Sequence, residues 1–180
     1  MRGKNRTLPK PVGNNPVVLH QPEFCFEGET LAPFLKSIQR EIESARALNT
    51  TLPPKFWLKQ QFAVGVNEVT RVLERMPKIP PEEHFLSNHV DSRAPCVHLQ
   101  AILIASNCNP RWMTKHLPAL AASRNVPLIF IKDRKESSLR LGELIKLKTA
   151  IAVGIKAKGN SINQLIKEVL VGDKVDSIEA

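Results

Sequence analysis

The sequence predicts an α/β protein, a three-layer α/β/α sandwich in which helices cover both faces of a small mixed sheet of about four strands. Three short runs, at 99–105, 126–131 and 149–155, are almost continuously apolar, which is typical of strands buried on both faces. Segments with helical features lie between and after them. With 180 residues, 42% of them hydrophobic, the chain can form one domain with a substantial core.

Predicted helices flank these strands. Apolar residues at helical spacing predict one helix over 31–48, and the helix that follows Gly65 buries Val66, Val69 and Leu73. Between them, the stretch TTLPPK indicates a break in regular structure. Further helices are predicted over 109–125, from Leu141, and over 161–170.

Two segments lie outside this regular pattern. Residues 1–24 carry four lysines or arginines, four prolines and no acid before Glu23, so we predict a basic N-terminal arm. The arm either contacts RNA or a partner, or serves as a solubilising tail. The rest, 25–180, is predicted to be a single domain. It contains a proline-rich insertion at 77–98, a length that indicates a functional loop or an added segment.

Charge and composition limit the partners. Lys and Arg number 26 against 17 Asp and Glu, a formal net charge of +9, so polyanions are expected partners. No apolar run approaches the roughly 20 residues of a membrane-spanning helix, and the N-terminus has no apolar signal region. The cysteines, Cys25, Cys96 and Cys108, are odd in number and form no CxxC pair. They indicate reduced intracellular thiols.

No feature of the sequence predicts catalysis, a cofactor or a metal. Neither a glycine-rich phosphate loop nor a G-x-S-x-G nucleophile turn is present. His84, His89, Cys96 and His98 invite a zinc hypothesis, but their spacing fits no standard zinc pattern. We therefore expect no catalytic residues, no metal ligands and no cofactor.

The run GVNEVTR at 65–71 carries the chemistry that points to a function. Gly65 allows close approach of another backbone, and the first N–H groups of the following helix form a phosphate site. Ionised Glu68 only accepts hydrogen bonds, so it suits paired donors such as guanine N1–H and N2–H₂. Asn67 suits a base edge or sugar, and Arg71 can clamp a phosphate. Alternatively, these three residues are a helix cap, a first-turn acid and a solvated charge.

This run resembles the signature of the kink-turn RNA-binding superfamily, which includes an archaeal ribosomal protein (L-seven-Ae) and core proteins of small nucleolar ribonucleoproteins. Together with SRNVP and LGELIKLKTAIAVGI, it is most similar to the 38-kilodalton-class subunit family of ribonuclease P and ribonuclease MRP. The similarity covers roughly residues 60–170 and keeps the order of the elements. The insertion at 77–98 is longer than compact members of the superfamily carry.

The resemblance implies a set of RNA-binding residues. The α-helical motif would contact sheared G·A pairs and the backbone of a kink, and Met113 would lie against an extruded base. The segment 144–147 would cap bulged nucleotides, with apolar contacts from Ile145 and Leu147 and a phosphate contact from Lys146. The alternatives are core packing for Met113 and a short helix packed on the sheet for 144–147. The implied RNA-binding set is Gly65, Val66, Asn67, Glu68, Arg71, Met113, Leu144, Ile145, Lys146 and Leu147.

The resemblance also implies a function. It predicts a noncatalytic RNA-binding subunit of ribonuclease P or MRP that supports maturation of precursor tRNA 5′ ends and rRNA processing. The partners would be a kink-turn-like element of the catalytic RNA and other protein subunits of the particle, without a membrane, in the nucleus and nucleolus. Two alternatives stay open: a ribosomal or small nucleolar core protein, and a protein-interaction module on the same fold.

Overall fold

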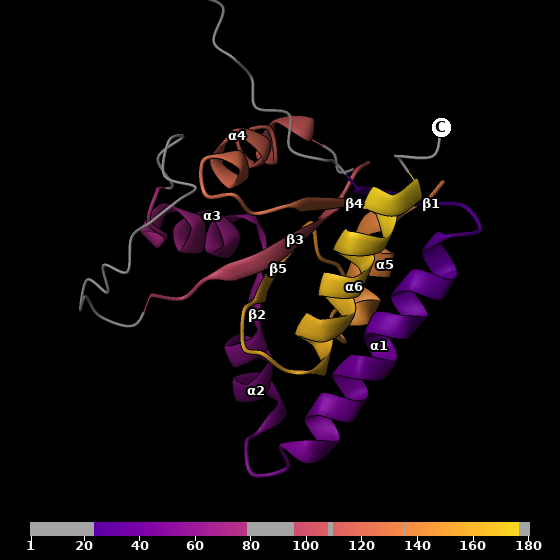
Figure 1. The fold of residues 1–180 in the computed structure, drawn as a ribbon, viewed down its shortest axis with the longest axis vertical. Helices are drawn as coiled ribbons and strands as arrows, with labels where there is room; N and C mark the ends of the chain where they lie inside the picture. Colours follow the sequence, from indigo (N-terminus) through magenta and orange to yellow (C-terminus); the bar gives the residue numbers. More distant parts are fainter. Residues whose placement is uncertain (1–23, 79–95, 108–109, 135, 177–180) are drawn as a thin grey trace, which may run out of the picture.

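A computed structural model describes residues 24–78, 96–107, 110–134 and 136–176. Its centre is a mixed five-stranded sheet with the order β1-β4-β3-β5-β2 (Figure 1). β1, β4 and β3 are parallel, β5 is antiparallel to β3, and β2 is antiparallel to β5. The strands are β1 (Phe24–Glu27), β2 (Phe62–Val64), β3 (Leu99–Ala105), β4 (Leu128–Lys132) and β5 (Ala152–Lys156).

Helices cover both faces of the sheet, which confirms the predicted three-layer arrangement. α1 (Leu31–Leu48), α2 (Pro54–Gln61), α5 (Ser137–Leu144) and α6 (Ser161–Asp176) pack on one face. α3 (Val66–Arg75) and α4 (Leu117–Ala122) pack on the other face (Figure 1). Each face of the sheet has its own hydrophobic core, and β3 contributes side chains to both. Ala101 and Leu103 face the layer with α1, while Ile102 and Ile104 face the layer with α3.

The sheet has five strands, whereas the sequence predicted about four. The two strands that the apolar runs did not identify are the shortest ones, β1 with four residues and β2 with three, and segments of that length carry little periodic signal. β1 begins at Phe24, which is buried and lies one residue inside the predicted arm. The rest of the arm, 1–23, lies outside the described residues, as does most of the predicted insertion, 79–95.

The predicted helix over 109–125 is divided into a 3₁₀ turn, η1 (Arg111–Met113), and α4. Pro118 explains the division, because a proline ring inside an α-helix clashes with the carbonyl four residues earlier. Leu117 accordingly donates its N–H to the Thr114 carbonyl in a tight turn. The 50–55 break is also shorter than predicted, since α2 begins at Pro54, where proline is tolerated in a first turn.

One edge of the sheet collects the ends of all its strands. The carboxyl ends of β1, β4, β3 and β2 meet there with the start of β5, and we call this the C-terminal edge. Main-chain hydrogen bonds trace it: Gly65 N–H to the Ala152 oxygen at 2.8 Å, Ala105 N–H to Ile151 at 2.9 Å, and Ser106 N–H to Ile131 at 3.0 Å. None of the helices in the described part of the chain is long and apolar enough to cross a membrane.

Candidate nucleic-acid interface

The start of α3 is shaped by the backbone of Gly65. Its φ of 90° and ψ of 156° lie in a region that is essentially restricted to glycine. The first intrahelical bond runs from the Val69 N–H to the Gly65 oxygen at 3.0 Å. The N–H groups of Val66, Asn67 and Glu68 therefore have no acceptor within the helix. A Cβ at Gly65 would meet no atom within 4 Å, so a ligand backbone can approach this point closely.

The polar side chains of the motif lie on the accessible side of α3. Asn67 is exposed, and Glu68 and Arg71 are 43% and 59% exposed with Arg71 Nη1 at 3.2 Å from Glu68 Oε2. Such an exposed pair stabilises a fold by at most about 1 kcal/mol, so a ligand can replace it at little cost. Val66, in contrast, is buried in the core beside β5, and only its main chain is available to a ligand.

A hydrogen-bonded chain fixes the first turn of α3 to the start of α4. The Thr70 hydroxyl donates to the Val66 carbonyl at 2.8 Å, and it lies 2.7 Å from His116 Nε2. When the Thr70 hydroxyl donates to Val66, His116 Nε2 is the donor to Thr70. His116 is therefore a positioning residue between two helices.

Lys156, which the sequence did not single out, ends β5 at the opposite end of the strand from Ala152 and interacts electrostatically with Glu68. The alternation of β5 places it on the α3 side of the sheet, with Ala152, and its ammonium donates to the Lys59 carbonyl. Burial lowers the pKa of Lys156, while the Glu68 carboxylate acts in the opposite direction and raises it. The alternation of side chains along β5 could have predicted which face of the sheet Lys156 occupies. A single lysine at the end of a strand, however, does not by itself indicate a functional role.

The η1 turn presents Met113 and an exposed tryptophan at the same edge of the sheet. Met113 is half-buried, so its predicted base contact and the alternative of core packing both stay open. Trp112 is 72% exposed, so its ring is accessible to a ligand or partner. Its neighbours Arg111 and Lys115 are exposed as well.

The segment 144–147 departs from its predicted role in part. Leu144 and Ile145 belong to the core, with Ile145 only 3% exposed. This burial is inconsistent with the predicted apolar contact between Ile145 and RNA, and it matches the alternative of a segment packed on the sheet. Lys146 and Leu147 remain accessible.

The end of α5 explains the exposure of Lys146. Lys146 has a φ of +58°, and its N–H donates to the Glu143 oxygen while the Leu147 N–H donates to Gly142. This is a Schellman motif with lysine at the left-handed position that usually holds glycine. Gly142 permits it, because a Cβ there would lie 2.6 Å from Thr149 Cα.

The fold thus brings three distant stretches of the sequence to the C-terminal edge. Gly65 adjoins Ala152 at the start of β5, where the segment 144–147 leads, and Ile151 adjoins Ala105 at the end of β3, from which η1 follows. Leu144, Ile145 and the side chain of Val66 are the predicted site residues that face the core instead.

The residues weighed as zinc ligands do not come together within the described structure. His84 and His89 lie outside the described residues, and the Cys96 thiol contacts the Arg75 carbonyl at 3.3 Å. Within the described ranges, no group of three or more His, Cys, Asp or Glu residues could hold a metal ion.

Comparison with known proteins shows what this fold is similar to. Residues 91–165 match the ribosomal protein L7Ae/L30e/S12e/Gadd45 family, a similarity that agrees with the resemblance found in the sequence. A solved structure, the Giardia lamblia 15.5kD RNA binding protein, has the same fold. Its TM-score is 0.52 at 16% identity, over 82% of this chain and 91% of that one.

The chain is also similar to the ribonuclease P protein subunit p38 of three mammals. The Bos taurus protein is 27% identical over 113 residues, which are 63% of this chain and 32% of that protein. The Homo sapiens protein is 30% identical over 99 residues, 55% of this chain and 26% of that protein. The Mus musculus protein is 30% identical over 97 residues. The matched region spans a third or less of the length of these relatives.

Proposed function

We propose that this chain is a noncatalytic RNA-binding subunit of a ribonucleoprotein, specifically of nuclear ribonuclease P or ribonuclease MRP. The observation that carries the proposal is the start of α3, where unpaired N–H groups, the open face of Gly65 and the Glu68–Arg71 pair lie together. The similarity to p38 supports the choice of particle. In this role the chain supports precursor tRNA 5′ maturation and rRNA processing in the nucleus and nucleolus.

In the proposed complex, different groups of the protein supply the affinity for RNA and the selectivity for particular bases. The N–H groups at the start of α3 and the cations Arg71 and Lys146 hold phosphates, and such contacts give affinity without sequence information. Glu68 accepts hydrogen bonds from the amino and imino groups of guanine. A Watson–Crick pair occupies the imino proton and one amino proton, whereas a sheared G·A pair of a kink-turn-like element leaves the imino N1–H and one N2 proton free. Other subunits of the particle are the proposed protein partners.

A mobility-shift assay at one fixed salt concentration tests the proposal. It compares a kink-turn RNA that carries tandem sheared G·A pairs with the same RNA carrying G·C pairs. We expect strong preference for the first RNA. Binding that is equal and salt-sensitive would refute base reading and favour a protein-interaction module on this fold. The RNA that co-purifies from cells then separates ribonuclease P or MRP from a ribosomal or small nucleolar particle.

Two variants assign the roles within the site. Glu68→Gln keeps the shape but removes the charge and one acceptor position, so we expect the G·A preference to fall while binding to both RNAs persists. Glu74→Gln is the matched control, because Glu74 is exposed on the same helix outside the motif. If Glu68→Gln discriminates as well as the original protein, Glu68 does not read bases.

A further inference from the structure

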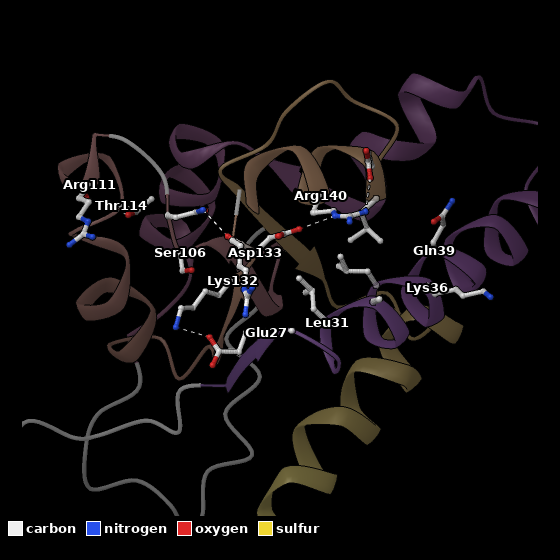
Figure 2. Close-up of a pocket in the computed structure, with 17 residues that line it drawn as sticks. Glu27, Leu31, Lys36, Gln39, Ser106, Arg111, Thr114, Lys132, Asp133 and Arg140 are labelled. Atoms are coloured by element: carbon white, nitrogen blue, oxygen red, sulfur yellow. Dashed lines mark hydrogen bonds and ion pairs between the residues drawn. The ribbon is translucent and has the colours of Figure 1, made fainter. Parts of the chain in front are cut away.

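A second polar feature lies on the C-terminal edge and extends from Arg111 and Leu144 to α1 and β1. It is a cleft of about 1270 Å³ between the first turns of α1 and the loops that follow β3 and β4 (Figure 2). The carboxyl ends of parallel strands are the usual place for ligands in α/β sheets. The volume exceeds the range of about 300–1,000 Å³ that is typical of small-molecule pockets, so an extended ligand fits it better.

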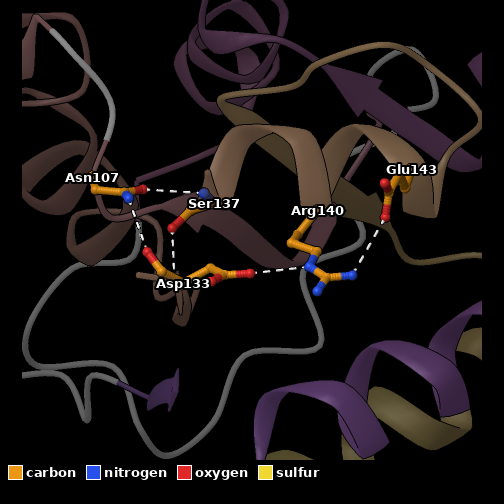
Figure 3. Close-up of polar contacts among 5 residues, drawn as sticks. All are labelled: Asn107, Asp133, Ser137, Arg140 and Glu143. Carbon is orange, nitrogen blue, oxygen red and sulfur yellow. Dashed lines mark hydrogen bonds and ion pairs between the residues drawn. The ribbon is translucent and has the colours of Figure 1, made fainter. Parts of the chain in front are cut away.

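Hydrogen bonds and ion pairs join the polar residues on the floor of this cleft (Figure 3). Arg140 Nε lies 3.0 Å from Asp133 Oδ2, and its guanidinium also lies 3.8 Å from Glu143. The fully buried Ser137 hydroxyl accepts the Asp133 N–H at 2.9 Å. The Asn107 amide donates to the Asp133 carbonyl at 2.9 Å and accepts the Ser137 N–H at 3.3 Å. The acids of the floor are therefore engaged internally, which removes most of their repulsion toward an anion.

The rim of the cleft is positive. Its lining has five basic and three acidic side chains, a formal net charge of +2. The acid at β1, Glu27, is held by Lys132 at 2.6 Å. Lys36, Arg111 and Arg134 are exposed and, within the described residues, have no acidic side chain within 4.0 Å. Three cations that form no ion pair within the described part of the chain therefore surround a neutralised polar floor, an arrangement that suits phosphate groups.

The cleft continues the candidate interface. Gly65 follows β2, at one end of the strand order, and the cleft lies at the ends of β3, β4 and β1. At about 4.8 Å per strand, the cleft begins about 10 Å from Gly65 along the edge and extends to about 19 Å. An RNA strand with stacked bases rises about 3.4 Å per nucleotide, so about three to six nucleotides reach from Gly65 to the cleft and across it.

We propose that this cleft binds the sugar-phosphate backbone of an RNA strand that leaves the kink held at α3, with Lys36, Arg111 and Arg134 as phosphate contacts. The inference rests on the proposed RNA-binding function and extends its footprint to α1 and β1. An acidic peptide would meet the same cations, but the continuity with the phosphate site at α3 favours RNA.

The test compares two kink-turn RNAs, a minimal one and one with a strand extended by about six nucleotides, over a range of salt concentrations. The original protein should show a steeper salt dependence with the extended RNA, by about 0.7–0.9 in log K against log salt for each phosphate contact. Each of Lys36→Ala, Arg111→Ala and Arg134→Ala should remove one such increment. At 0.1 M salt this corresponds to about sixfold weaker binding of the extended RNA per contact, with minimal RNA unaffected by Lys36→Ala.

Lys167→Ala is the matched control, since Lys167 is an exposed lysine of α6 outside the cleft. Circular dichroism and thermal unfolding verify that each variant folds. Equal salt slopes for the two RNAs, together with an intact G·A preference, would overturn the cleft proposal alone. If the original protein shows no preference for the RNA with G·A pairs over the RNA with G·C pairs, the proposed function itself is overturned. Competition by a poly-glutamate peptide, without any effect of the RNA extension, would assign the cleft to a protein partner instead.

Discussion

Replacement of Lys146 by glycine should stabilise the fold and weaken RNA binding at the same time. Lys146 holds a φ of +58°, a conformation that costs an L-residue about 1–2 kcal/mol and glycine almost nothing. Against this gain, glycine adds about 0.4–1 kcal/mol of unfolded-state entropy. The ion pair with Glu43, at 3.9 Å and largely exposed, contributes a few tenths of a kcal/mol at most. The net expectation is a gain of about 0.5 kcal/mol.

Urea unfolding monitored by circular dichroism measures this gain, with Lys146→Ala as the decisive comparison. Alanine removes the same charge but keeps the unfavourable backbone conformation, so Lys146→Gly should be more stable than Lys146→Ala by about 1 kcal/mol. Both variants should bind every RNA more weakly, with a salt slope reduced by about 0.7–0.9. Equal stability of the two variants would refute the argument that Lys146 retains a strained position for a phosphate contact.

Other expectations follow from individual contacts. Arg124→Met should destabilise the fold by about 1.5–3 kcal/mol in urea unfolding, because the buried Arg124 donates to a carbonyl of the last turn of α3 at 2.9 Å; a loss below 0.5 kcal/mol would contradict this. Gly142→Ala should cost about 1–3 kcal/mol, since its Cβ would lie 2.6 Å from the loop backbone, whereas Gly172→Ala, with open space around it, should not destabilise. Glu68→Gln should lower the pKa of Lys156 further, because the Glu68 carboxylate raises it; NMR titration of the lysine side chain measures this, and an unchanged pKa would show that the two charges do not interact.

Much of the architecture followed from local patterns. The helix over 31–48 has the predicted bounds, because its apolar stripe is long and regular enough to identify the buried face without knowledge of its neighbours. The buried strand at 99–105 was likewise recognisable from its apolar run. Gly65 was predicted to begin a helix with accessible N–H groups, and its positive φ supplies a local reason why glycine occupies that position.

The tertiary structure alone decided the features whose stability depends on distant partners. β1 exists because Phe24 to Glu27 pair with β4, a partner about a hundred residues away, and four residues have no stable strand structure by themselves. Ile145 could not be distinguished from an exposed loop residue by sequence, since its burial depends on how α5 and β5 meet.

The same distinction applies to function. The chemistry proposed for 65–71 could be predicted from the sequence, because neighbouring residues at the start of one helix supply its donors, its acceptor and its cation. The electrostatic interaction between Lys156 and Glu68, and the cleft that joins Lys36, Arg111 and Arg134, depend on the tertiary structure. Charged groups interact strongly only when they lie a few ångströms apart. The order of the strands in the sheet sets the distances between these side chains, and no local sequence pattern encodes that order.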